Sequence, residues 1–87
     1  MVPVLLRGVR VKDDQVRKMP VLLGPERALM LDTIGAAILE RVDGARDLDG
    51  IIGDLAAAYD APPEVIRGDV EAFLGDLSDK RLLEMRP

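Results

Sequence analysis

The amino-acid sequence predicts an α+β fold in which a small three-stranded antiparallel sheet is followed by three helices. Up to Leu31 apolar residues alternate with polar ones between short turn sequences, as in strands, whereas after Asp32 they recur at helical spacing. A small sheet is not stable alone, so we expect one of its faces to rest on the helices. A short apolar tail over residues 82–85 could close the core. The 87 residues are too few for two cores, so we expect one domain over residues 1–87.

Two turn sequences separate the predicted strands. The first strand contains Val9 and Val11, which alternate with basic residues. Pro20 lies within the second strand, and because proline has no N–H to donate, it should face away from a neighbouring strand or lie at a bulge. In chain order the sequence predicts a polar turn over residues 12–15, the second strand over 16–23, a proline turn over 24–27 and the third strand over 28–31.

Capping residues mark the ends of three amphipathic helices. Asp32 can accept an N–H from the first turn of the first helix, and Gly44 ends that helix. The second helix starts at Asp47 and ends near Asp60, and the third begins at Pro62, where a missing N–H costs nothing. The residues expected to face the core are Ile34, Ala37, Ile38 and Val42, then Leu48, Ile51, Ile52, Leu55 and Tyr59, and finally Ile66, Val70, Phe73, Leu74 and Leu77.

The composition excludes most kinds of active site. The chain has no histidine and no cysteine, which removes the usual general base at neutral pH, the commonest metal ligand and the best nucleophile. Its acidic residues fall mainly in turns, caps and helix exteriors, and no phosphate-binding glycine loop occurs. We therefore expect a protein that is not an enzyme, with no catalytic residue, no metal and no cofactor.

Nothing in the sequence predicts secretion or membrane insertion. The apolar stretch over residues 1–6 is too short for a secretory signal, and no apolar run approaches the roughly 20 residues that span a bilayer. A soluble cytoplasmic protein with no membrane partner is the expectation.

Charge is unevenly distributed along the chain. Residues 1–27 hold six basic and three acidic residues, a net charge of +3, whereas the rest holds six basic and thirteen acidic residues, a net charge of −7. Three helices with a small sheet are also the plan of a DNA-binding winged helix, but residues 62–81, the would-be recognition helix, carry five acids against three bases. Because phosphate contacts need clustered lysine and arginine, we expect no nucleic-acid partner.

Short segments in a fixed order carry a resemblance that covers nearly the whole chain. They are Arg7-Gly-Val-Arg10, Val21-Leu-Leu23, Pro25-Glu-Arg27, Leu29 with Leu31-Asp32, Ile34-Gly-Ala-Ala-Ile-Leu39, Val42-Asp-Gly44, Tyr59-Asp-Ala61, Asp69-Val70 and Leu82-Leu-Glu84. In this order and spacing they resemble the PqqD proteins of pyrroloquinoline quinone (PQQ) biosynthesis. The resemblance implies a non-catalytic, winged-helix-like peptide-recognition domain. It further implies a chaperone that binds the precursor peptide PqqA and presents it to the radical SAM enzyme PqqE, which crosslinks a glutamate and a tyrosine of that peptide.

The resemblance also implies where the peptide binds: as an added strand beside the third strand, packed against the third helix. An exposed sheet edge offers N–H and C=O groups with which a disordered peptide can form main-chain hydrogen bonds. Leu29 and Leu31 share one face of the third strand and Ala28 and Met30 the other, so one pair should enter the core and the other border the groove. The peptide-binding candidates are Arg27, Ala28, Leu29, Met30, Leu31 and Asp32 on the strand, and Arg67 and Glu71 on the third helix.

These candidates also have a structural interpretation. The apolar strand residues are ordinary packing residues in that alternative, and Asp32 is a helix cap. Arg67 and Glu71 lie on one flank of the apolar stripe of the third helix, and the sequence leaves open whether this flank or the opposite one, around Asp69, borders the strand. The strand edge also permits homodimers, and a recognition element for a different modified-peptide pathway is the rival function.

Overall fold

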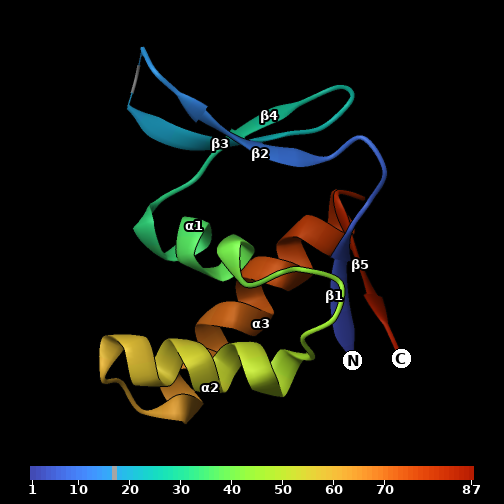
Figure 1. The fold of residues 1–87 in the computed structure, drawn as a ribbon. Helices are drawn as coiled ribbons and strands as arrows, with labels where there is room; N and C mark the ends of the chain where they lie inside the picture. Colours follow the sequence, from blue (N-terminus) through green and yellow to red (C-terminus); the bar gives the residue numbers. More distant parts are fainter. Residues whose placement is uncertain (17) are drawn as a thin grey trace.

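The chain folds into two small sheets and three helices (Figure 1). The computed structural model describes residues 1–16 and 18–87. In chain order the elements are β1 (Val2–Leu5), β2 (Arg10–Asp14), β3 (Met19–Leu23), β4 (Ala28–Met30), α1 (Thr33–Glu40), α2 (Leu48–Tyr59), α3 (Pro63–Asp79) and β5 (Leu83–Arg86). Strands β2, β3 and β4 form the antiparallel sheet that the sequence predicts, and the three helices follow it. The predicted α+β plan is therefore confirmed.

The turn between β2 and β3 lies later in the chain than the sequence predicts. Asp13 and Asp14 belong to β2 rather than to a turn, and β3 begins at Met19 rather than at residue 16. The carboxylate of Asp14 accepts the N–H of Val16 at 3.0 Å, and Lys18 has a positive φ of 55°, so the reversal falls between these residues. The side chain of Val16 is accordingly 92% exposed. Arg17, which the predicted second strand included, lies outside the described residues.

Pro20 lies where the ladder between β3 and β4 ends. The N–H of Leu31 donates to the Pro20 carbonyl at 3.0 Å, but proline has no N–H to return. The last full pair of the ladder is Val21 with Met30, one step before Pro20. Proline is thus neither at a bulge nor turned away from β4, and its missing donor helps to limit the length of β4.

The predicted caps begin the first two helices. The Asp32 carboxylate accepts the N–H of Gly35 at 2.6 Å, and the Asp47 carboxylate accepts the N–H of Gly50 at 2.8 Å. The end of α1 differs from the prediction, because the helix stops at Glu40 and Gly44 belongs to the loop that follows. The ends of α2 and α3 lie where the sequence places them.

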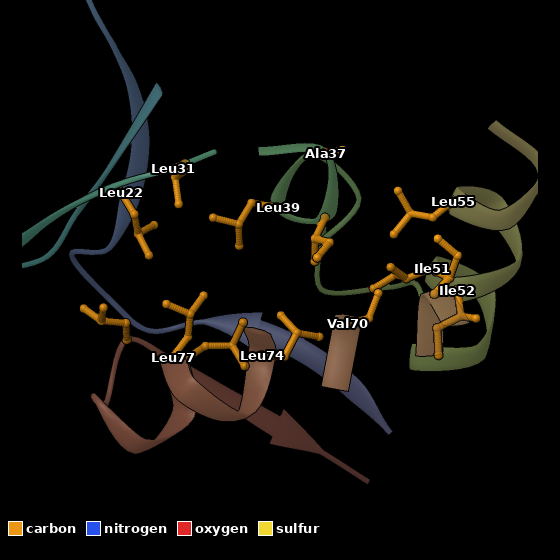
Figure 2. Packing of buried hydrophobic residues seen from close by; sticks show 14 of the residues in the cluster. Leu22, Leu31, Ala37, Leu39, Ile51, Ile52, Leu55, Val70, Leu74 and Leu77 are labelled. Carbon is orange, nitrogen blue, oxygen red and sulfur yellow. The ribbon is translucent and has the colours of Figure 1, made fainter. Parts of the chain in front are cut away.

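One hydrophobic core joins the three-stranded sheet to the helices. Figure 2 shows Leu22 and Leu31 on the sheet side and Leu74 and Leu77 of α3 on the opposite side. Most residues predicted to face the core are buried there, Val42, Leu48 and Phe73 are half-buried against it, and two are exposed. Ile34 is 42% exposed because it lies in the first turn of α1, and Tyr59 is 45% exposed because it lies in the last residue of α2.

The sequence does not predict the second sheet, in which both ends of the chain pair. Val2 lies opposite Arg86 and Leu5 opposite Leu83 in an antiparallel ladder. The expected tail at residues 82–85 does close the core, because Leu82 and Leu83 are 3% and 1% exposed, but most of it is a strand. The partners lie at opposite ends of the sequence, so no local pattern indicates their pairing.

Candidate functional site

The candidate peptide site is the outer edge of β4. This strand lies at the end of the three-stranded sheet and, among the described residues, its only strand neighbour is β3. The N–H of Gly24 donates to the Arg27 carbonyl at 2.8 Å, and the N–H of Leu31 donates to Pro20, so these residues turn their main chain toward β3. Main-chain direction alternates along a strand, and the N–H and C=O of Ala28 therefore point away from the sheet. A guest strand would bind at that position.

The side chains of β4 alternate between the core and the opposite face of the sheet. Leu31 is buried and Leu29 is half-buried against the core, whereas Ala28 and Met30 are exposed. The predicted division into two pairs is confirmed, with the leucines as the inward pair. A guest strand would continue this alternation, with half of its side chains on the helix side of the sheet.

Leu29 of β4 and Leu31 after it belong to the same hydrophobic cluster as Leu74 and Leu77 in the C-terminal half of α3. A methyl group on Gly24, in the turn before β4, would lie 2.7 Å from Cδ2 of Leu82, just beyond the end of α3. A methyl group on Gly35, in the first turn of α1, would lie 3.0 Å from Cε1 of Phe73. The turn before β4 and the helix after it thus lie against Leu82 and Phe73, respectively. We use the name strand–helix groove for the region between the edge of β4 and Phe73, where the sequence leads us to expect the peptide.

Phe73 identifies the flank of α3 that faces this groove. Asp69, Asp76 and Lys80 are spaced three, four or seven residues from it and so share its side of the helix. The Lys80 ammonium donates to the Asp76 carboxylate at 2.6 Å, which leaves the aromatic ring as the apolar part of this flank. From its spacing in the sequence, Phe73 was expected only in the core. Phe73 is the only phenylalanine in the sequence, and this was the one feature that could have marked it as a candidate for peptide contact.

Arg67 and Glu71 lie on the other flank of α3. Arg67 donates to the Asp49 carboxylate of α2 at 2.7 Å and lies 3.6 Å from the Glu71 carboxylate. The hydrogen bond from Arg67 lowers the pKa of Asp49, and the same bond raises the pKa of Arg67. Six residues separate Arg67 from Phe73, which places them about 120° apart around the helix. The structure therefore ties Arg67 to α2, and a peptide-binding role for this flank stays a prediction.

Two polar candidates lie at the two ends of β4. Asp32 follows the strand and its carboxylate caps α1, so its structural interpretation is confirmed. Arg27 precedes the strand, its carbonyl is bonded to Gly24, and its side chain is exposed. A guest strand beside β4 would meet a cation at one end of its site and a carboxylate at the other.

The site offers hydrogen bonds and apolar contacts rather than reactive groups. Across residues 1–16 and 18–87, no three acidic side chains come together where they could hold a metal ion. Within the same residues, no helix combines the length and the apolar character needed to cross a membrane.

Comparison with known proteins gives the same fold. The solution NMR structure of the PqqD truncation of Methylobacterium extorquens PqqCD is described as a functional, stand-alone recognition element for ribosomally synthesised and post-translationally modified peptides. It is 44% identical, matches with a TM-score of 0.83, and the match covers 95% of this chain and 88% of that one. TbiB1 in complex with the TbiA(beta) leader peptide has a TM-score of 0.81 at 22% identity, over 97% of this chain and 98% of that chain, and shows a likeness of fold alone.

Sequence relatives identify the family. A protein of Rhizobium meliloti (strain 1021), named PqqA binding protein, is 49% identical over 93% of this chain and 83% of its own length. Residues 21–83 match the family model described as coenzyme PQQ synthesis protein D (PqqD). The matched range includes the last three residues of β3, all of β4 and the three helices, and the first residue of β5. The chain therefore belongs to the PqqD family.

Proposed function

We propose that this protein is a peptide-binding chaperone of PQQ biosynthesis that takes up the precursor peptide PqqA as an added strand on β4 and presents it to the radical SAM enzyme PqqE. The single observation that carries the proposal is the position of β4 at the edge of the sheet, on the side of the core that it shares with α3. The name of the Rhizobium meliloti relative, PqqA binding protein, supports the choice of peptide. The protein acts by binding and performs no chemical step itself.

Main-chain pairing and side-chain contacts have separate roles in this mechanism. Each main-chain hydrogen bond contributes about 0.5–1.5 kcal/mol net, and β4 has only three residues, so pairing alone gives weak binding. Side chains of the guest that point toward Phe73 add buried apolar area, at about 25 cal/mol per Å². The edge therefore sets the direction and register of the guest, and the strand–helix groove supplies most of the affinity.

Strand addition also relates peptide binding to self-association. A second copy of the chain pairing through β4 would use the same main-chain groups as the guest. A homodimer formed in this way would dissociate as the peptide binds. This homodimer and the cytoplasmic location stay predictions from the sequence.

Substitution of Ala28 separates strand addition from other binding modes. Ala28→Pro removes an N–H that points away from β3, so the ladder between β3 and β4 keeps its hydrogen bonds. Ala28→Val is the matched control, because it adds side-chain volume at the same position and retains the N–H. PqqA peptide is titrated into each purified variant by calorimetry, and amide NMR spectra establish that both are folded.

We expect Ala28→Pro to weaken PqqA binding about tenfold. The substitution removes one main-chain hydrogen bond and leaves a carbonyl of the guest without its donor. Ala28→Val should remain within about twofold of the unmodified protein. Equal affinity of the two folded variants would show that the peptide does not pair with β4, and failure of the unmodified protein to bind PqqA would reject the function itself.

A further inference from the structure

The second sheet has an open edge along β5. Figure 1 shows β1 and β5 side by side, apart from the sheet that contains β4. Across residues 1–16 and 18–87, β1 is the only strand that pairs with β5, so the opposite edge of β5 faces no other strand. A two-stranded sheet with an open edge can be extended by a strand from another molecule.

The register shows which main-chain groups lie on this edge. The N–H of Leu6 donates to the Leu82 carbonyl at 3.1 Å, so these residues form a hydrogen-bonded pair at the end of the ladder. Bonded and non-bonded pairs alternate along antiparallel strands, and the N–H and C=O groups of Leu83 and Met85 therefore point away from β1. These groups are directed at the open edge.

The other edge of this sheet, along β1, is less suited to a further strand. The Met1 carbonyl accepts the N–H of Leu48, at the start of α2, at 2.8 Å. Pro3 occupies the next outward-pointing position, and proline has no N–H to offer a neighbour. Of the two edges, β5 is therefore the better one for strand addition.

The charges of β5 are complementary to those of a second β5. Glu84 and Arg86 alternate with Leu83 and Met85, which pack on the core, so the two charged side chains share the face away from it. The Arg86 guanidinium donates to the Glu84 carboxylate at 2.6 Å, and these side chains are 62% and 43% exposed, respectively. When two such strands run antiparallel with Met85 opposite Met85, each acid lies opposite a base.

We propose that the protein forms a two-fold homodimer in which the β5 strands of two copies pair along their open edges, with Met85 at the axis. Each Glu84 then lies opposite Arg86 of the second copy, and four charges of alternating sign form a square. A register centred on Glu84 would oppose two carboxylates, and one centred on Arg86 would oppose two guanidiniums. The two Met85 residues exchange main-chain hydrogen bonds, and the two small sheets become one sheet of four strands.

This dimer leaves the candidate peptide site free. The edge of β4 belongs to the other sheet, so each copy can bind a guest while the two copies stay paired. A dimer through β4 would instead dissociate as the peptide binds. Because β5 has only four residues and exposed ion pairs contribute little, we expect an association that increases with protein concentration and weakens with salt.

Reversal of the β5 charges tests this register. Glu84→Arg or Arg86→Glu alone places like charges opposite each other, and the double variant with both changes restores opposite charges in exchanged positions. Arg10→Glu, on β2 of the other sheet, is the matched control for net charge. Sedimentation velocity over a range of protein concentrations measures the dimer dissociation constant. We expect each single β5 variant to raise it at least about tenfold, and the double variant and the control to stay within about twofold of the unmodified protein.

A second measurement locates the contact. Amide hydrogen exchange followed by NMR should show that protection of the Met85 N–H increases with protein concentration. A protein that stays monomeric throughout, or single variants that associate normally, would overturn the proposal, and a double variant that fails to recover would reject the pairing of Glu84 with Arg86. Dissociation of the dimer by PqqA would assign the contact to β4. The inference does not depend on the proposed function, and failure to bind PqqA would leave this test valid.

Discussion

A methyl group added at Gly35 tests the contact that sets α1 and β4 against α3. In a helix, alanine is favoured over glycine by about 1 kcal/mol, so Gly→Ala is stabilising wherever the methyl group has room. At Gly35 the methyl group would lie 3.0 Å and 3.2 Å from Cε1 and Cζ of Phe73 and 3.1 Å from Oδ1 of Asp32. At Gly53 of α2 it would meet nothing within 4 Å. Both substitutions gain helix propensity, but only the one at Gly35 crowds Phe73 and the Asp32 cap.

The magnitude follows from these distances. Overpacking a well-packed site costs about 1–3 kcal/mol, and a weakened cap at Asp32 adds up to about 1 kcal/mol. Net of the propensity gain, Gly35→Ala should lower the free energy of unfolding by about 1–2 kcal/mol. Gly53→Ala should raise it by about 0.5–1 kcal/mol. Urea unfolding followed by circular dichroism separates a gap of this size.

The same substitution has a functional readout. Because Phe73 borders the strand–helix groove, moving its ring should weaken PqqA binding in Gly35→Ala and leave it unchanged in Gly53→Ala. A smaller side chain at residue 73 should relieve the crowding, so Gly35→Ala combined with Phe73→Leu should be more stable than the two separate effects predict. If Gly35→Ala stabilises the protein as much as Gly53→Ala, the close contact between α1 and α3 does not exist and this account of the groove is wrong.

Further predictions address the core, a cap, an ion pair and the charge of the site. Leu22→Ala should lower the free energy of unfolding by about 2–5 kcal/mol, because Leu22 is fully buried between sheet and helices, as urea titration would show. Asp47→Ala should cost about 1 kcal/mol through loss of the cap on Gly50, and Asp47→Asn should recover most of it. Arg67 lowers the pKa of Asp49 below its ordinary value of 3.8, so the pair stabilises the folded protein above that pH. This stabilisation is lost as the pH falls and the Asp49 carboxylate is protonated. Unfolding curves of Asp49→Asn and of the unmodified protein should therefore converge at acid pH. PqqA affinity should fall modestly with salt, and equal affinities at low and high salt would contradict an electrostatic contribution.

The elements that the sequence predicts correctly are those specified by neighbouring residues. The caps at Asp32 and Asp47 depend on a carboxylate and an N–H three residues later, and a single short segment contains both. The pairing of β1 with β5 joins residues at opposite ends of the chain, so no window of sequence contains the information. The end of α1 was misplaced because Gly44 resembles a helix stop, although the helix ends earlier at Glu40.

For the candidate site too, the sequence predicts what depends on neighbouring residues and not what depends on contacts between distant ones. Alternation within β4 is local, and the sequence correctly separates Leu29 and Leu31 from Ala28 and Met30. Which flank of α3 borders the groove depends on how the helix is rotated against the sheet. The apolar stripe of this helix has acidic residues on both sides, so the sequence does not favour one flank over the other. The contact between Gly35 and Phe73 fixes this rotation in the folded protein.

The short length of β4 determines how such a site can be selective. A long exposed edge would pair with any extended chain, including other copies of the protein, and a three-residue edge limits this hazard. The short edge also limits the binding free energy that main-chain pairing contributes for the correct peptide. These hydrogen bonds do not depend on the identity of the guest's residues, so they cannot distinguish one peptide from another. Discrimination between peptides would therefore come from the side chains on either side of the edge: Phe73 and its flank on the core side, and Met30 on the opposite side of the sheet. Within the PqqD fold, substitutions on these two surfaces are the ones expected to change which peptide is bound while leaving the sheet unchanged.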